Sequence, residues 1–280
     1  QAPCCLSPLP VKKSRLFHSI FGLLALAACT ATAAAAAPAS SKPAAKPAVA
    51  APAEDGWVAL FNGKDLTGWK VLGGKADFKV VNGEIVGTIV VGNHNTFLCT
   101  EKNYADFILE LEYNCPEEIN SGVQIRSEWN EERREVKDIP ALPRQRHKQV
   151  FSGPKHVSGY QVEIEFRPGR TAGIYDEDRR HTWVSPHAGT AADEAFRKQG
   201  RDRSIVKPGE WQKLRVEARG TSMRTYLDGV LRADAQDSAS ATGLIGLQVH
   251  AAPKRDAGKS VRFRNIRIKE LHQQPAPAAK

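Results

Sequence analysis

The sequence lacks a large excess of charge of one sign once its two ends are set aside. The whole chain has 280 residues and a net charge of +9. Of its 40 basic and 31 acidic residues, 34 and 30 fall within residues 55–272, where the two signs are interspersed. Proteins that bind nucleic acid through its phosphates need a field of one sign. The near balance therefore excludes nucleic acid as a partner.

Cysteine is scarce in the same region, where only Cys99 and Cys115 occur. The segment between the two cysteines is predicted to form a hairpin that turns near residues 102–106. This turn would put Cys99 opposite position 109 rather than opposite Cys115. No disulfide is predicted between them. The region also has no HxH or CxxC spacing. His250, Glu163 and Glu165 are the one set that could bind a divalent cation, and no cofactor is predicted.

Long hydrophobic runs are absent except for residues 16–28, which follow Lys12, Lys13 and Arg15. This run is short for a membrane span and is typical of an export signal. It ends Leu26-Ala27-Ala28-Cys29, which resembles a bacterial lipobox with Cys29 as the lipidated residue. Ordinary cleavage among the small residues that follow is the alternative. The protein is expected in the periplasm or on the outer membrane as a lipoprotein, touching the membrane only through a lipid anchor, or secreted.

Composition divides the chain into four parts. Residues 1–29 are the expected signal peptide, and residues 30–54 are an Ala- and Pro-rich linker without large side chains to bury. Residues 55–272 are the working domain. Residues 273–280 are expected to be a disordered tail.

The working domain is predicted to be all-β, because its apolar residues alternate with polar ones and turn residues separate the runs. Asn82-Gly83 joins residues 77–81 to 84–88, and Asp228-Gly229 joins residues 223–227 to 230–233. Both dipeptides favour tight hairpins. Only residues 191–199 are predicted to be helical, with Gly200 as the C-terminal cap.

The strands have apolar and polar faces that can be read separately. The apolar stripes, predicted to form the core, are Phe107, Leu109, Leu111 and Tyr113; Val123 and Ile125; Tyr160, Val162, Ile164 and Phe166; and Ile245, Leu247 and Val249. The opposite faces contain Glu110 and Glu112; Gln124 and Arg126; Gln161, Glu163 and Glu165; and Gln248 and His250. Such a mixture of titratable groups predicts a polar cleft. A solvated face with charges paired across strands is the alternative.

Six separated segments resemble one family. They are ALFNGKDLTGW (residues 59–69), NGEIVG (82–87), TEKNYADF (100–107), NSGVQIR (120–126), SGYQ (158–161) and RNIRIKEL (264–271). The chain is similar in these segments to the DUF1080 family, also called the 3-keto-disaccharide hydrolase domain. The resemblance implies a concanavalin-like jelly-roll sandwich of two antiparallel sheets, usually secreted, acting on glycosides whose sugar is oxidised to a ketone at C3.

One further segment, YDEDRR at residues 175–180, resembles a YDExRR segment of one branch of this family. Its side chains are expected at the rim of the sheet, where they would contact the substrate. The residues concerned are Tyr175, Asp176, Glu177, Arg179 and Arg180. A charged turn in which the arginines pair with the acids is the alternative.

The implied chemistry needs no covalent nucleophile, because a C3 ketone acidifies the proton on C2. Removal of that proton gives an enolate that expels the group at C1, and water can then add to complete a hydrolysis. His250 is the preferred base and Glu163 the second choice. Arg126 is expected to stabilise the enolate or ketone oxygen. Gln124, Gln161, Gln248, Glu110 and Glu165 are expected to bind sugar hydroxyls.

Two other functions fit parts of the sequence. The run QVEIEF at residues 161–166 resembles the catalytic strand of sandwich-fold β-glucanases, but Gln161 replaces the nucleophile, and an amide cannot act as one. A lectin-like module that binds carbohydrate without cleaving it is the other alternative, with Trp129 and Trp183 as stacking platforms. If the 3-keto reading holds, an upstream sugar 3-oxidoreductase is an expected partner.

Overall fold

The computed structural model describes residues 56–92, 94–145 and 150–271. The expected signal peptide with Cys29, the linker and the tail lie outside the described residues, so they stay predictions. Within the described part of the chain, no helix has the length and apolar character needed to cross a membrane.

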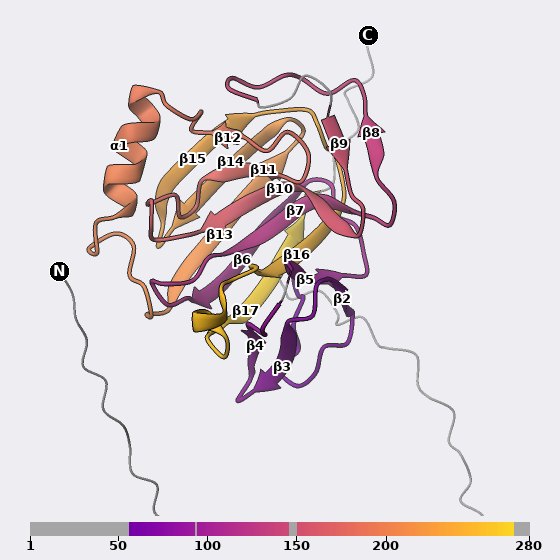
Figure 1. Cartoon of the computed structure of the whole chain (residues 1–280), viewed down its shortest axis with the longest axis vertical. Helices are drawn as coiled ribbons and strands as arrows, with labels where there is room; N and C mark the ends of the chain where they lie inside the picture. The colour runs from indigo at the N-terminus through magenta and orange to yellow at the C-terminus, as the bar shows by residue number, and fades with distance from the viewer. Residues whose placement is uncertain (1–55, 93, 146–149, 272–280) are drawn as a thin grey trace, which may run out of the picture. The chain divides into compact units, whose positions relative to one another are not determined.

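Two large antiparallel sheets make up the fold (Figure 1). The eight-stranded sheet has the order β15 (Val230–Gln236), β14 (Ser222–Leu227), β13 (Gln212–Arg219), β6 (Phe107–Asn114), β17 (Ser260–Glu270), β4 (Glu84–Thr88) and β3 (Asp77–Val81), and β1 (Trp57–Ala59) also pairs with β17. The seven-stranded sheet has the order β12 (Trp183–Ser185), β11 (Ile174–Glu177), β10 (His156–Ile164), β7 (Ser121–Asn130), β16 (Leu244–Val249), β5 (Thr96–Thr100) and β2 (Trp69–Gly73). β8 (Arg134–Val136) and β9 (Val150–Ser152) form a separate pair. The predicted all-β sandwich is confirmed.

The core lies between the two large sheets, and the predicted apolar stripes form it. From β6 it receives Phe107 and Leu109, and from β10 it receives Tyr160 and Val162, all fully buried. Because side chains alternate along a strand, the same alternation points the polar residues of β10 away from the core. The position of Gln161 and Glu163 on the outer face of the seven-stranded sheet follows directly.

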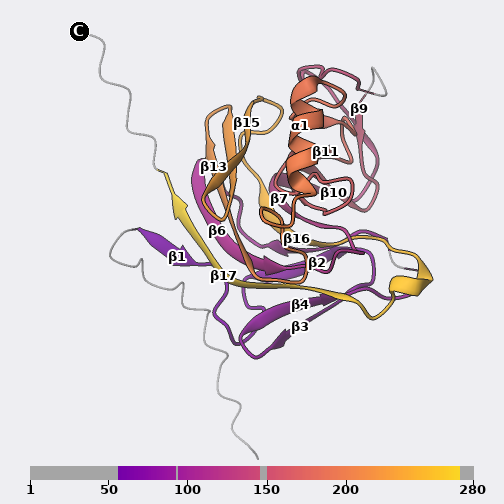
Figure 2. The ribbon, with the colours of Figure 1, turned by 90° about the vertical axis from the view of Figure 1, so that its left-hand side faces the viewer.

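Both predicted hairpins are present, as the pairs β3/β4 and β14/β15. The predicted helix is α1 (Ala191–Gly200), which begins where the Thr190 side chain accepts a hydrogen bond from the Asp193 amide. Figures 1 and 2 show α1 at the edge of the sandwich, where Arg232 of β15 donates to the Phe196 carbonyl. A short 3-10 turn, η1 (Lys254–Asp256), lies between β16 and β17.

The role predicted for Gly200 is wrong. It is the last helical residue rather than a cap, and a Cβ built there would lie 2.0 Å from the Gly169 carbonyl oxygen. A side chain is excluded because two backbone segments touch, not because the turn needs an unusual φ angle.

The hairpin predicted around residues 102–106 does not form. β5 belongs to the seven-stranded sheet and β6 to the eight-stranded one, so this segment crosses from one sheet to the other. Cys99 and Cys115 are both buried free thiols. Burial raises the pKa of Cys99 to about 12, so this thiol does not ionise to the reactive thiolate at neutral pH.

Candidate active site

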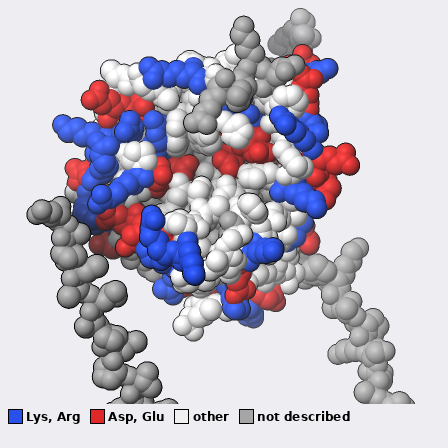
Figure 3. Space-filling model, in the orientation of Figure 1, with Lys and Arg blue, Asp and Glu red and all other residues white. Residues whose placement is uncertain are grey.

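A cavity of about 310 Å³ opens on the outer face of the seven-stranded sheet. We call it the central cavity. Four of the residues that line it are carboxylic acids or histidine: Glu163, Glu165, Glu177 and His250. The others are Asn120, Gln161, Tyr175 and Trp183. In Figure 3, acidic side chains gather in the middle of this face, over β10 and β11, and most Lys and Arg side chains lie around them. Of the residues predicted to form a polar cleft, Gln161, Glu163, Glu165 and His250 line this cavity.

Strand pairing brings these residues together from distant parts of the chain. β10 places Gln161 and Glu163 on one face, and its neighbour β11 pairs Tyr175 with Gln161 and Glu177 with Gly159. His250 follows directly after β16, which lies on the other side of β7. With Trp183 from β12 (Trp183–Ser185), the site thus spans five adjacent strands of the sheet.

The glutamines form a chain of hydrogen bonds beneath the cavity. Gln124 Nε2 and Gln248 Nε2 both donate to Gln161 Oε1, at 2.9 and 2.8 Å. Gln161 Nε2 in turn donates to Glu163 Oε2 at 3.1 Å. Gln124 and Gln248 are fully buried and do not line the cavity. Of the three amides, only Gln161 lies where it can contact a ligand, and the other two fix its orientation.

Glu163 has a strongly perturbed carboxyl group in the cavity. Its Oε1 accepts a 2.7 Å hydrogen bond from Asn120 Nδ2, and the side chain is almost completely buried. Burial and the nearby charge of Glu165 raise its pKa to about 8, although the hydrogen bonds from Gln161 and Asn120 oppose the rise. Glu163 is therefore largely protonated at neutral pH and can donate a proton.

His250 is shifted in the opposite sense. Burial lowers its pKa, the hydrogen bond with the Ala251 carbonyl opposes this, and the nearby His156 lowers it further. The Nδ1 atom lies 2.5 Å from the Ala251 oxygen, so it bears the hydrogen and Nε2 is the basic nitrogen. A neutral imidazole and a protonated carboxyl that line the same cavity can act as an acid–base pair.

Glu177 belongs to a second group of titratable side chains. Its Oε1 accepts a 3.0 Å hydrogen bond from Asn95 Nδ2 and lies 3.6 Å from His156 Nε2. Burial raises its pKa, while the neighbouring His156 opposes the rise. Glu163, Glu165 and Glu177 are thus three carboxyls of raised pKa that line the cavity.

An aromatic pair lines one part of the central cavity. The rings of Tyr175 and Trp183 lie 5.0 Å apart, and the guanidinium of Arg170 lies 4.1 Å from the centre of the Trp183 ring. Such a surface suits the apolar face of a sugar ring. Trp129, the other predicted platform, does not line the cavity; it packs against the buried cluster of Phe97, Cys99, Val157 and Leu244.

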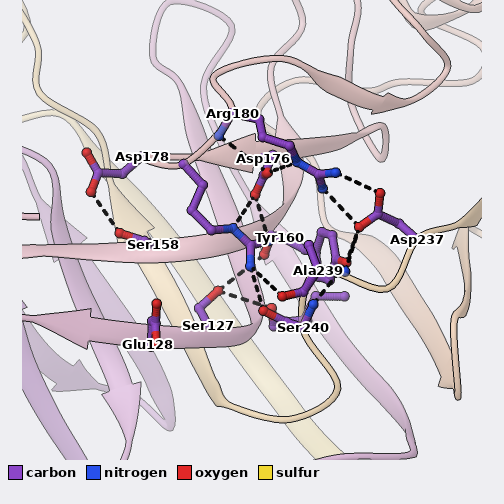
Figure 4. Close-up of polar contacts among 12 residues, drawn as sticks. Ser127, Glu128, Ser158, Tyr160, Asp176, Asp178, Arg180, Asp237, Ala239 and Ser240 are labelled. Carbon is purple, nitrogen blue, oxygen red and sulfur yellow. Dashed lines mark hydrogen bonds and ion pairs between the residues drawn. The ribbon is translucent and has the colours of Figure 1, made fainter. Parts of the chain in front are cut away.

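The YDEDRR segment divides between the site and the interior. Tyr175 and Glu177 line the cavity, whereas Asp176, Arg179 and Arg180 are buried. Figure 4 shows Arg180 between Asp176 and Asp237, and it bonds Asp237 through two nitrogens at 2.9 Å each.

Arg179 completes this cluster by donating to Asp176 Oδ1 at 2.7 Å and to the Ser240 hydroxyl at 2.6 Å. Asp176, Arg179 and Arg180 are thus not substrate contacts. They form an ion cluster with Asp237 that anchors β11, because Asp176 is part of that strand. The alternative of internal pairing holds for these three residues.

Arg126 does not reach the central cavity. Its guanidinium donates to the carbonyls of Ala105 and Gly220, at 2.7 and 2.6 Å, and to Asp106 at 2.8 Å. The alternation along β7 breaks at this point, because Arg126 has a φ of 47° and two residues of β7 oppose Gly159 alone. Arg126 therefore links the two sheets and cannot stabilise an enolate.

Glu110 lies on the wrong sheet for the cavity. It belongs to β6 in the eight-stranded sheet, where it pairs with Lys213, Arg215 and Arg267. Burial acts to raise its pKa, but hydrogen bonds from Arg267 and the other two cations outweigh that effect and lower the pKa to about 2. Glu110 is a structural ion-pair residue. For the eight-stranded sheet, the alternative of charges paired across strands is the right one.

Sequence reasoning missed three residues of this site. Asn120 bonds Glu163, and Asn95 and His156 contact Glu177. Asn120 is the first residue of the NSGVQIR segment, and its place in that family-like segment was the one sequence signal that could have identified it. Asn95 and His156 come from the ends of β5 and β10, where no alternation identifies them. Among the described residues, no three His, Cys, Asp or Glu side chains are arranged to bind a metal ion.

The substitution Gln161→Glu tests the amide chain. The new carboxylate would face Glu163 Oε2, which is 3.1 Å from the present Nε2 atom. One carboxyl of the pair must then stay protonated, so stability should fall as pH rises and both groups ionise. We expect the free energy of unfolding at pH 9 to drop by about 1–3 kcal/mol, with a smaller loss at pH 5. Chemical denaturation at both pH values measures it. The matched control Gln236→Glu, at an exposed position of β15, should show no such pH dependence.

The comparisons with known proteins identify the family of the chain. The family model described as the 3-keto-alpha-glucoside-1,2-lyase-like domain matches residues 56–269 of this chain. No curated protein sequence is significantly similar.

Similar solved structures include the carbohydrate-binding module CBM66 from Bacillus subtilis, with 15% identity, a TM-score of 0.47, and coverage of 73% of this chain and 96% of the module. A candidate glycosyl hydrolase from Parabacteroides distasonis has 23% identity, a TM-score of 0.47, and coverage of 78% and 95%. Porphyranase B from Zobellia galactanivorans has 11% identity, a TM-score of 0.45, and coverage of 82% and 98%. The matched residues include nearly the whole described sandwich, so the chain belongs to the family with a 3-keto-alpha-glucoside-1,2-lyase-like domain.

Proposed function

We propose that the protein cleaves glycosides oxidised to a ketone at C3, by removing the proton on C2 and eliminating the group at C1. The observation that supports this most is the pairing in one cavity of His250, whose pKa is lowered, with Glu163, whose pKa is raised to about 8. At neutral pH one group is ready to accept a proton and the other to donate one.

In the proposed reaction, His250 Nε2 takes the proton from C2 and the electron pair forms an enolate with the C3 oxygen. Reforming the ketone breaks the bond from C1 to the leaving oxygen, and a double bond forms between C1 and C2. Glu163 gives its proton to the leaving oxygen. Water can then add across the double bond, which makes the overall reaction a hydrolysis, or the unsaturated sugar leaves as the product of a lyase.

The enolate oxygen needs hydrogen-bond donors, and Arg126 does not reach the cavity. None of the described residues that line it is Lys or Arg. Among the lining residues that can donate hydrogen bonds are Tyr175, through its hydroxyl, and Gln161, whose Nε2 atom carries two hydrogens, one of them bonded to Glu163. Gln161 lies on β10 together with Glu163, and Tyr175 lies opposite Gln161 on the neighbouring strand β11, so the two donors are preorganised for this role.

Conventional double displacement is not supported. Gln161 occupies the position of the glucanase nucleophile, and its carbonyl oxygen already accepts two hydrogen bonds. An amide held in this way cannot form a glycosyl ester. A module that only binds carbohydrate would use the same Tyr175 and Trp183 surface but would have no need of the perturbed Glu163.

Matched glycosides, oxidised and unoxidised at C3, test the proposal. We expect the purified protein in deuterium oxide to exchange the C2 proton of the oxidised glycoside and to release its leaving group, with no reaction of the unoxidised one. Release from the unoxidised glycoside would favour a conventional glycosidase. Binding without exchange or release would favour the carbohydrate-binding alternative.

This substrate must be produced by a reaction that oxidises a sugar hydroxyl at C3, so we propose that a sugar 3-oxidoreductase acts upstream. We also propose that the protein meets its substrate outside the cytoplasm, on the basis of the apolar run before Cys29. Detecting the protein in a fractionated host cell, with and without Cys29→Ser, would test the anchor.

A further inference from the structure

A second hollow of about 600 Å³ lies next to the central cavity. We call it the charged hollow. The loop before β7 contributes Glu117 and Glu118, Arg167 comes from the segment between β10 and β11, and Arg255, Asp256 and Lys259 come from the segment between β16 and β17. It is the larger of the two spaces, and charges of both signs line it.

The charged hollow adjoins the central cavity, because Asn120 and Glu165 line both. Asn120 also donates to Glu163 at 2.7 Å, which puts the proposed proton donor at the junction. The Asn120 Oδ1 atom is buried and has no hydrogen-bond partner. His250, Tyr175, Glu177 and Trp183 line only the central cavity. A ligand whose scissile bond lies beside Glu163 would therefore extend into the hollow.

The two spaces differ in chemical character. The central cavity has the aromatic pair of Tyr175 and Trp183, whereas none of the described residues that line the charged hollow is aromatic. Arg167 bonds Glu117 at 2.7 Å, and Lys259 bonds Asp256 at 2.9 Å. The Nε atom of Arg255 lies 3.9 Å from Asp256 Oδ2, which is too far for a hydrogen bond, and the Arg255 side chain is 82% exposed. Its guanidinium is the group most available to a ligand.

We propose that the charged hollow is the subsite for the leaving group, so that the second sugar of a 3-keto disaccharide binds there, through polar contacts instead of aromatic stacking. The inference rests on the proposed function and adds the direction in which the substrate lies. The oxidised ring packs on Tyr175 and Trp183, the bond to be broken crosses Asn120 and Glu165, and the second sugar bonds Arg255 and the carboxylates of the hollow.

Two substrates that share the oxidised ring test the subsite: a 3-keto disaccharide and the methyl 3-keto glycoside, which has no second ring. In Arg255→Ala, the ratio of kcat/KM for the disaccharide to that for the methyl glycoside should fall about 5- to 20-fold, mainly through KM, because a hydrogen bond to a charged group is lost. Glu118→Trp, which puts a bulky ring in the hollow, should lower the same ratio. Lys254→Ala is the matched control, since Lys254 is an exposed cation next to Arg255 that does not line the hollow.

Calorimetric binding of the unoxidised disaccharide provides a readout that needs no catalysis. Arg255→Ala and Glu118→Trp should both weaken this binding, and Lys254→Ala should not. An unchanged substrate ratio and unchanged affinity in both hollow variants would overturn the subsite. A wild-type protein that binds the disaccharide with the expected variant pattern but cleaves no 3-keto glycoside would contradict the proposed function alone.

Discussion

Replacing Glu163 by Gln should lower kcat for a 3-keto glycoside by about 10²- to 10⁴-fold, which is the range for loss of a general acid. Glutamine keeps the shape of the side chain but has no proton to give to the leaving oxygen. The loss should be smaller for substrates with a good leaving group, because their oxygen needs less protonation. Steady-state kinetics on leaving groups of different acidity would measure this trend.

The pH dependence of the same reaction separates the two proposed roles. Activity requires neutral His250 and protonated Glu163, so kcat/KM should rise through the lowered pKa of His250 and fall near pH 8. His250→Gln should remove the acidic limb and Glu163→Gln the alkaline limb. If activity rose through pH 8 instead of falling, Glu163 would act as the base, and the assignment of the two groups would be reversed.

A control must show that Glu163→Gln leaves the fold intact. Because the folded-state pKa of Glu163 is raised from 4.5 to about 8, the folded protein binds more protons than the unfolded chain between these values. Wild-type stability therefore decreases as pH rises through that window. The Gln variant lacks this loss, so its unfolding free energy should depend less on pH. A variant that is inactive and also unfolded at pH 7 would carry no information on the acid.

The alternation of side chains predicts which residues are buried, but not which sheet a strand joins. A period of two fixes only the face of each strand on which a side chain lies. This is enough to place Gln161 and Glu163 together, because they share β10. It cannot show that β6 belongs to the other sheet, and so Glu110 was grouped with residues that it never meets.

Arg126 and Arg180 show a second limit of the sequence. A bulge reverses the face of Arg126, and the pattern of residue types around it contains no sign of the bulge. In the YDEDRR segment, the strand ends at Glu177 and the chain turns back, which buries Arg179 and Arg180. The partner of Arg180, Asp237, lies 57 residues further along the chain. Contacts of this range depend on the packing of loops, for which the sequence has no local signature.

The ion cluster beneath β11 should determine much of the stability of the site. Arg180 is fully buried and bonds both Asp176 and Asp237. Burial acts to raise the pKa of Asp237, but hydrogen bonds from Arg180 and Tyr160 outweigh it, and the pKa lies below its ordinary value. Arg180→Met would leave these carboxylates buried with one cation fewer. We expect the free energy of unfolding to fall by about 3–5 kcal/mol, measured by denaturation at pH 7.

The companion variant Arg180→Met/Asp237→Asn distinguishes an unpaired charge from a loss of packing. If the cost comes from the uncompensated carboxylate, neutralising Asp237 should recover a large part of the stability, since replacing both partners of a buried pair is far less damaging than removing one. Arg224→Met, at an exposed ion pair with Asp234, should have little effect. Because Asp176 lies between Tyr175 and Glu177 on β11, the single variant should also raise KM while it is still folded, and the double variant should partly reverse that change. A double variant no more stable than Arg180→Met would mean that the cluster acts by packing alone.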